Sequence, residues 1–131
     1  MKNIKIKSVL ISVFNKEGLD ELCRFFFQNQ IDIFSTGGTE KYIKSLNIPV
    51  KSVESVTGYP SILGGRVKTL HPKIFGSLLS RNNSVEDQDD IKKYELPKID
   101  MVVVDLYPFS ETVRLSDDDN EIIEKIDIGG V

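Results

Sequence analysis

The stretch SVLISVFNKEGLDELCRFFFQNQIDIFSTGGT, residues 8–39, decides the fold. It begins with a short, β-branched apolar run at residues 8–13, which is typical of a buried parallel strand. Apolar side chains at helical spacing follow in residues 19–27, and we expect Asn15 to cap that helix. A second strand, at residues 31–35, then enters a glycine-containing loop. This strand–helix–strand order predicts a parallel sheet with right-handed crossovers.

The rest of the chain continues the alternation of strands and helices. The elements expected after residue 39 are a helix ending near Leu46, a strand at 50–53, an irregular segment at 55–72, a helix at 73–80, a surface loop at 81–90 and a helical turn at 91–95. Residues 100–105, DMVVVD, are expected to form the most clearly buried strand. Acidic residues 117–119 suit the N-terminus of an apolar-periodic helix around Ile122, Ile123 and Ile126. We therefore predict one α/β domain over residues 1–131, with a mainly parallel central sheet.

Composition limits the class of protein. The chain has 131 residues, 40% of them hydrophobic and 28% charged, which is an ordinary globular balance. Cys23 is the single cysteine, so no internal disulfide can form, and we expect it to be a core residue of a cytoplasmic protein. The apolar stretch near the N-terminus is short and lacks a cleavage site, which favours a strand over a signal peptide. No apolar run approaches the length needed to span a membrane.

Charge is distributed unevenly along the chain. Residues 1–73 carry a net charge of +5 and residues 74–131 a net charge of −8, within a total of −3. A basic first half suits an anionic ligand. The absence of basic runs and of tryptophan disfavours nucleic acid as that ligand.

Two short loops follow the first two predicted strands, at residues 12–16 and 35–39. Ligands of open parallel sheets gather at the carboxyl ends of the strands, where glycine-rich loops let backbone N–H groups approach an anion. The alternative is a plain turn with Thr39 as a helix cap, but two such loops on neighbouring strands favour phosphate binding. The loops match neither a Walker A motif nor GxGxxG, which disfavours nucleoside triphosphates and dinucleotides. The groups available to a phosphate are the side chains of Ser12, Lys16, Ser35, Thr36 and Thr39 and the backbone of Gly37 and Gly38.

A third segment, GGRVKTLHP at residues 64–72, also carries candidate ligand groups. Arg66 and Lys68 are two positions apart, so an extended chain points both to one side. The alternative is a solvated loop with ordinary charges, and composition does not decide between the two. His71 is the only histidine, which excludes a multi-histidine metal centre, and carboxylates are not clustered at ligand spacing. A catalytic triad using His71 would lack a nucleophile elbow, so we expect a structural, hydrogen-bonding role for it.

Five segments, in this order along the chain, resemble one known enzyme family. They are ISVFNKEGL (11–19), STGGTEKYI (35–43), TGYPSILGGRVKTLHPKIFGSLLSR (57–81), VVVDLYPF (102–109) and EKIDIGG (124–130). Together they are similar to the IMP cyclohydrolase domain of bifunctional AICAR transformylase/IMP cyclohydrolase enzymes, over essentially the whole chain, and GRVKTLHP is the most specific of them. The resemblance implies a methylglyoxal-synthase-like three-layer α/β fold and a homodimer. It also implies closure of the purine ribonucleotide formyl-AICAR to IMP with loss of water, without metal or redox cofactor.

The same resemblance implies roles for individual residues. Lys68 would stabilise the developing oxyanion with Tyr107 beside it, and Asp127 would hydrogen-bond or deprotonate the carboxamide nitrogen. Gly129 would bring backbone close to the base. The residues implied to bind substrate are Ser12, Lys16, Ser35, Thr36, Gly37, Gly38, Thr39, Arg66, Thr69, Asp105 and Gly129. The cofactor 10-formyltetrahydrofolate is expected only for a transformylase domain, which this sequence does not contain.

The sequence departs from the family pattern in three places. Asp105 replaces the usual Asn before Leu-Tyr-Pro-Phe, and an ionised Asp accepts hydrogen bonds but cannot donate them to a substrate. Gly65 stands where the family often has Asp. The family also continues into a helix with a further catalytic lysine, so we expect a chain truncated at its C-terminal end that binds nucleotide but turns over poorly. Two alternatives share the fold: methylglyoxal synthase, and a regulatory module that binds a phosphate-bearing ligand without turnover.

Overall fold

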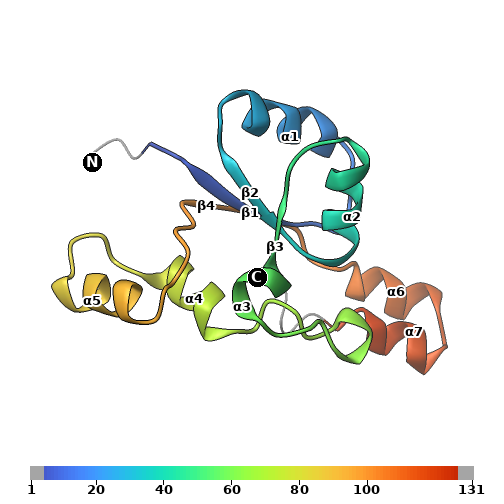
Figure 1. Cartoon of the computed structure of the whole chain (residues 1–131). Coiled ribbons are helices and arrows are strands. Elements are labelled where there is room, and N and C mark those ends of the chain that lie inside the picture. Colours follow the sequence, from blue (N-terminus) through green and yellow to red (C-terminus); the bar gives the residue numbers. More distant parts are fainter. Residues whose placement is uncertain (1–4, 127–131) are drawn as a thin grey trace.

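A four-stranded parallel sheet lies at the centre of the computed structural model, which describes residues 5–126 (Figure 1). The strand order is β3-β2-β1-β4. The strands are β1 (Ser8–Ser12), β2 (Asp32–Ser35), β3 (Lys51–Ser52) and β4 (Met101–Val104). The helices are α1 (Leu19–Gln28), α2 (Gly37–Ser45), α3 (Val53–Thr57), α4 (Pro72–Leu79), α5 (Val85–Lys93), α6 (Phe109–Leu115) and α7 (Asp119–Glu124), with a 3-10 turn η1 (Leu63–Gly65).

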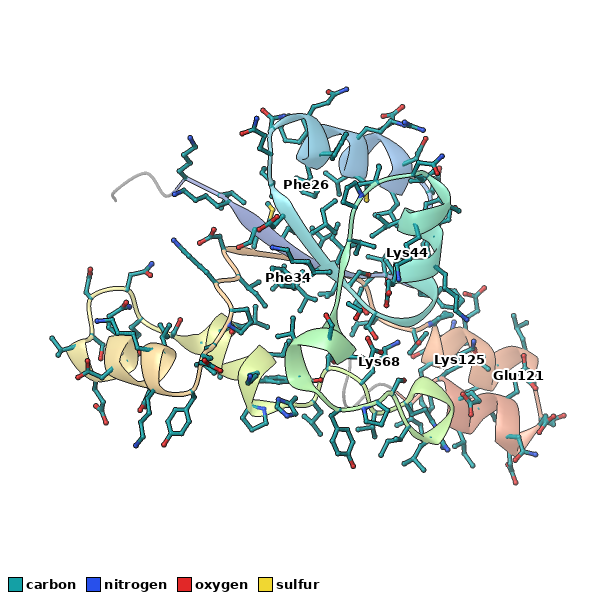
Figure 2. All side chains as sticks on the ribbon, in the orientation of Figure 1. Phe26, Phe34, Lys44, Lys68, Glu121 and Lys125 are labelled. Carbon is teal, nitrogen blue, oxygen red and sulfur yellow. The ribbon has the colours of Figure 1, made fainter. Side chains whose placement is uncertain are left out.

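Each face of the sheet carries its own hydrophobic core. Val9 and Ile11 of β1 pack with α1 and α2, whereas Leu10, between them, packs on the opposite face with α3 and α4. Phe26 of α1 and Phe34 of β2 belong to these two cores and lie on opposite sides of the strands in Figure 2. Helices therefore cover both faces of the sheet, and the predicted three-layer α/β architecture is confirmed.

The parallel pairing of the three main strands is also confirmed. β1 pairs with β2 from Ser8 opposite Asp32 onwards, and with β4 up to Ser12 opposite Val104. The carboxyl ends of these strands consequently lie along one edge of the sheet. The expected strand at residues 50–53 is shorter than predicted, because Val53 already begins α3 and the Ser52 hydroxyl caps that helix by accepting from the Ser55 N–H.

The prediction that residues 100–105 form the most buried strand is wrong. In β4, the side chains of Met101, Val102 and Val104 are 36–40% exposed, and only Val103 packs against the first core. The cause is position: among the described residues β4 has a single strand neighbour, β1, and so it forms the edge of the sheet. An apolar run of this kind is typical of a strand buried on both faces, but the run does not reveal the strand order.

The predicted loop at residues 81–90 is wrong as well, because most of it belongs to α5. Ser84 caps this helix by accepting from the Asp87 N–H, and Arg81 pairs with Asp87 at 2.8 Å. Acidic residues in the first turn and lysines in the last turn favour the helix through its dipole. The helix is favoured by these local contacts and has no buried residue, which is why hydrophobic periodicity did not find it.

Asn15 does not cap α1 as expected. The cap of α1 is Gly18, at φ 71°, and the Asn15 side chain instead accepts from the Glu17 N–H. His71 caps α4 through Nδ1, which accepts from the Lys73 N–H at 3.1 Å, so its expected structural role is confirmed. Cys23 is fully buried, and burial raises its thiol pKa to about 11. In residues 5–126 no helix combines the length and apolar character that crossing a bilayer requires.

Candidate functional site

A pocket of about 330 Å³ lies at the carboxyl edge of the sheet. Segments from distant parts of the sequence meet there: the end of β1, the first turn of α2, the loop after η1, the loop after β4 and the end of α7. The residues that line it are Ser12, Val13, Phe14, Lys16, Gly38, Thr39, Gly65, Arg66, Lys68, Asp105, Tyr107, Lys125 and Ile126. This is the strand edge at which the sequence predicts ligand binding.

The charges around this pocket favour an anion. Four of its lining side chains are cationic, those of Lys16, Arg66, Lys68 and Lys125, and among the described lining residues Asp105 is the one carboxylate. No group of three or more potential metal ligands of the His, Cys, Asp or Glu type occurs within residues 5–126. The donor set therefore suits a phosphate better than a cation.

Lys16 is held inside the site by the loop that carries it. Its ammonium donates to the carbonyl oxygen of Val13 and, at 3.2 Å, to that of Phe14. Burial lowers the pKa of Lys16, and the positive charge of Lys68 lowers it further, while Asp105 acts in the opposite direction. An anion in the pocket would relieve the repulsion between the two lysines.

Asp105 fixes the same loop from the other side. Its two carboxylate oxygens accept from the N–H groups of Phe14 and Asn15, the latter at 2.8 Å. Both contacts need an acceptor, and the ionised carboxylate supplies two acceptor oxygens where an amide supplies one. Asp at this position is thus explained by loop positioning, which was not foreseen from the sequence.

The hydroxyl groups of the loop between β2 and α2 are bound within the protein. Thr39 accepts from the Val13 N–H and donates to the Val13 carbonyl oxygen at 2.9 Å, which joins the two loops. Ser35 donates to the Ile11 carbonyl oxygen at 2.7 Å, and Thr36 donates to Glu54 at 2.7 Å. Ser35 and Thr36 are fully buried and do not line the pocket. The loop therefore offers a ligand its backbone more than its hydroxyls.

Thr36, and not Thr39, is the N-cap residue of α2, and its side chain makes no capping hydrogen bond. None of the N–H groups of Gly37, Gly38 and Thr39 donates to a residue of the described part of the chain. Unpaired N–H groups at a helix N-terminus, with the partial positive charge of the helix dipole, are typical of anion sites.

Arg66 and Lys68 line the pocket together, although the segment is not extended as expected: Arg66 has helical backbone (φ −72°, ψ −20°) at the end of η1. The Arg66 Nε donates to the Leu63 carbonyl oxygen at 2.9 Å and lies 3.7 Å from a carboxylate oxygen of Glu124. The Lys68 ammonium lies 3.7 Å from the point where a Cβ on Gly37 would be, and Gly37 has φ 56°. Lys68 thus reaches the first turn of α2. Thr69, also predicted here, is fully buried and does not line the pocket.

Aromatic rings and a lysine form the remaining wall. Phe14 and Tyr107 meet edge to face at 5.5 Å, and the Lys125 ammonium lies 5.0 and 5.7 Å from their ring centres. Figure 2 shows Lys68 and Lys125 in the region between α3 and the α6–α7 pair. Sequence reasoning missed Lys125, although it belongs to the EKIDIGG segment. The predicted residues Asp127 and Gly129 lie outside the described residues.

A second, wider cavity of about 750 Å³ adjoins the first and shares Gly38, Gly65, Arg66, Lys68 and Tyr107 with it. Its other walls come from Gly37, Glu40, Lys41, Lys44, Glu54, Ser61, Ile62, Leu63, Gly64 and Glu124. Because the two cavities adjoin, a phosphate at the start of α2 would leave room for a larger attached group.

Comparison with known proteins places this architecture in a family. The family profile described as MGS-like domain matches residues 18–131. Among solved structures, a crystal structure described as that of ForH superposes with a TM-score of 0.77 at 26% sequence identity, covering 96% of this chain and 64% of that one.

Curated relatives carry the name bifunctional purine biosynthesis protein PurH. The protein from Bacteroides thetaiotaomicron is 55% identical over 127 residues, and that from Clostridium acetobutylicum is 50% identical over 125 residues. These matches cover 97% and 95% of this chain but 25% of each relative, so the chain spans about a quarter of their length. The chain therefore belongs to the MGS-like domain family, and it corresponds to the N-terminal part of the bifunctional PurH proteins.

Proposed function

We propose that this chain carries the IMP cyclohydrolase site of purine biosynthesis, which closes formyl-AICAR to IMP. The observation that supports this most strongly is the cationic pocket, built from the motif residues of a chain whose relatives are named for purine biosynthesis. The reaction joins the carboxamide nitrogen to the formyl carbon of the same molecule, and water then leaves as the second ring closes.

The ribose phosphate serves as the handle. Donors and positive charge for it come from the Gly37 and Gly38 N–H groups, which have no partner within residues 5–126, from the partly buried ammonium of Lys16 and from the guanidinium of Arg66. Because the reaction is intramolecular, holding one productive rotamer is much of the catalytic task. Correct orientation contributes roughly 7–11 kcal/mol in favourable intramolecular cases.

The reacting end of the substrate lies next to the phosphate, between Lys68, whose ammonium reaches the first turn of α2, and Tyr107. Lys68 stabilises the oxygen that becomes negative when nitrogen attacks the formyl carbon, and Tyr107 lines the same pocket. Asp127, which lies outside the described residues, accepts a proton or a hydrogen bond from the carboxamide nitrogen. No metal or redox cofactor takes part in this proposal. The protein acts in the cytoplasm as a homodimer on a purine ribonucleotide, and 10-formyltetrahydrofolate serves another part of the PurH protein.

The test compares two reactions in one preparation. This chain, and a PurH-length protein that carries it as the N-terminal part, are supplied in turn with formyl-AICAR and with a triose phosphate. We expect IMP binding by the chain alone and IMP formation by the longer protein, with no methylglyoxal from either. Methylglyoxal formation would contradict the proposal. A longer protein that binds IMP but forms none would contradict it too, and would favour a regulatory module.

A further inference from the structure

Glu54 is a residue for which the proposed mechanism has no role, and it makes an unusual contact. It lies in the first turn of α3, and its Oε1 accepts from the hydroxyl of Thr36 at 2.7 Å. Its second oxygen, Oε2, is buried and has no hydrogen-bond partner among the described residues. A carboxylate oxygen that is buried without a partner reduces stability, which raises the question of what the contact that the other oxygen makes contributes.

The contact with Glu54 uses the hydroxyl of Thr36, a residue that stands where a threonine commonly caps a helix. Thr36 is the N-cap residue of α2, with the extended backbone typical of that position (φ −147°, ψ 160°). A threonine there ordinarily turns its oxygen towards the second or third N–H of the helix, which here belong to Gly38 and Thr39. In this protein the hydroxyl donates to Glu54 instead, and it makes no capping bond.

We infer that Glu54 is a positioning residue that keeps the N-terminus of α2 open for the ligand's phosphate by holding the Thr36 hydroxyl away from it. This inference rests on the proposed function, because it assumes that a nucleotide phosphate binds at the N–H groups of Gly37 and Gly38. Glu54 lines the same 750 Å³ cavity as these two glycines. By its charge alone, a carboxylate near the phosphate would weaken binding. Holding the Thr36 hydroxyl away from the helix N–H groups is an effect of Glu54 that would oppose this loss.

The inference gives a result opposite in sign to that of simple electrostatics. In Glu54→Ala, the Thr36 hydroxyl is free to cap α2 and then competes with phosphate. We expect the affinity for IMP and for inorganic phosphate to fall about five- to thirty-fold, which equals one N-cap bond of about 1–2 kcal/mol at 1.4 kcal/mol per tenfold. The thermal midpoint should not fall below that of the unmodified chain, since a cap is gained and an unpaired buried oxygen is removed.

Two matched variants separate charge from positioning. Glu54→Gln keeps an acceptor for Thr36, so its affinity for IMP should stay within about twofold. Glu40→Ala removes a carboxylate from the same cavity without touching Thr36, and it should leave IMP affinity unchanged or slightly tighter. If Glu54→Ala tightened IMP binding as Glu40→Ala does, the charge of Glu54 alone would explain its effect on affinity, and the inference would be wrong.

The decisive variant is Thr36→Val, because valine has the shape of threonine but has no hydroxyl with which to cap α2. The double variant Glu54→Ala/Thr36→Val should recover IMP affinity to within about twofold of the unmodified chain. Calorimetric titration with IMP and with inorganic phosphate, beside thermal unfolding of each variant, gives both readouts. No recovery in the double variant, or a Thr36→Val variant that itself binds poorly, would overturn the inference. An unmodified chain that binds no IMP would instead refute the proposed function.

Discussion

Two segments form the pocket in different ways. In the loop between β2 and α2, the hydroxyls of Ser35, Thr36 and Thr39 are all hydrogen-bonded to protein groups. In the segment after η1, the charged groups of Arg66 and Lys68 line the pocket. The side chains of the first segment hold the shape of the site and leave its backbone N–H groups to a ligand, whereas the side chains of the second segment present charge. Substitutions in the two segments should therefore differ in effect: those in the first should reduce stability, and those in the second should reduce catalysis or ligand binding.

The largest effect should come from Lys68→Ala, made in the PurH-length protein. Charge grows on the formyl oxygen only as the ring closes, so its stabiliser acts on kcat more than on binding. We expect kcat to fall about 10²–10³-fold, as on removal of an oxyanion donor in other enzymes. Arg66→Ala should instead weaken IMP binding, because a guanidinium suits phosphate. Steady-state kinetics and IMP titration of both variants measure this, and an unchanged kcat would remove Lys68 from the mechanism.

A substitution in the other segment should reduce stability. Thr39→Val removes both hydrogen bonds between the Thr39 hydroxyl and the backbone of Val13. A partly buried N–H group loses its acceptor, so the free energy of unfolding should fall by about 1–3 kcal/mol. Lys68→Ala, measured in parallel by urea unfolding, should change that free energy by less than about 0.5 kcal/mol. If both variants lost the same free energy of unfolding, the proposed difference in role between the two segments would be wrong.

A smaller effect should appear in the pH dependence of binding. Burial and Lys68 lower the pKa of Lys16 below 10.5, and a bound anion favours the charged lysine and raises that pKa again. IMP affinity should therefore be highest at pH values below the pKa of Lys16 in the free protein, and it should fall as the pH rises through that pKa. The loss begins at a lower pH than an ordinary lysine would give. Lys16→Arg should remove this loss, since arginine stays protonated, and IMP titrations from pH 7 to 10.5 test it. Identical profiles for both proteins would exclude Lys16 from the site.

The smallest effect is expected for Glu124→Gln. The carboxylate of Glu124 lies 3.7 Å from Arg66, and both side chains are about half exposed. Exposed ion pairs contribute little, so the free energy of unfolding should change by less than about 1 kcal/mol. Freed from its partner, Arg66 should bind IMP equally well or up to about twofold more tightly. A marked loss of affinity, measured by calorimetry, would show that Glu124 itself takes part in binding.

The sequence was informative wherever hydrophobic periodicity and local motifs determine structure. Residues 8–39 predicted the first strand, helix and second strand, because alternating burial on two faces leaves a readable pattern. The exposure of β4 was not predictable, since it depends on which strands lie beside it. Helix α5 was missed because its stability comes from Ser84, Asp87 and terminal charges. The Ser-x-x-Asp spacing was present in the sequence and could have indicated a cap.

For the site, the sequence identified the segments but not the direction of each side chain. Ser12, Lys16, Gly38, Thr39, Arg66, Lys68, Asp105 and Tyr107 were singled out, and all eight line the first pocket. Whether a hydroxyl points to a ligand or to the protein depends on distant partners, as the bond between Thr36 and Glu54 shows. Lys125 was missed for the same reason, because only the fold brings the end of α7 to Phe14 and Tyr107.

The central claim is that a purine nucleotide binds with its phosphate at the start of α2. Titrating IMP into ¹⁵N-labelled protein, while recording amide NMR spectra, tests it most directly. We expect the amide signals of Gly37 and Gly38 to shift with the occupancy of the site, while that of Cys23, which is buried in α1, does not shift. Gly37 and Gly38 amides that do not move when IMP is saturating would contradict the account.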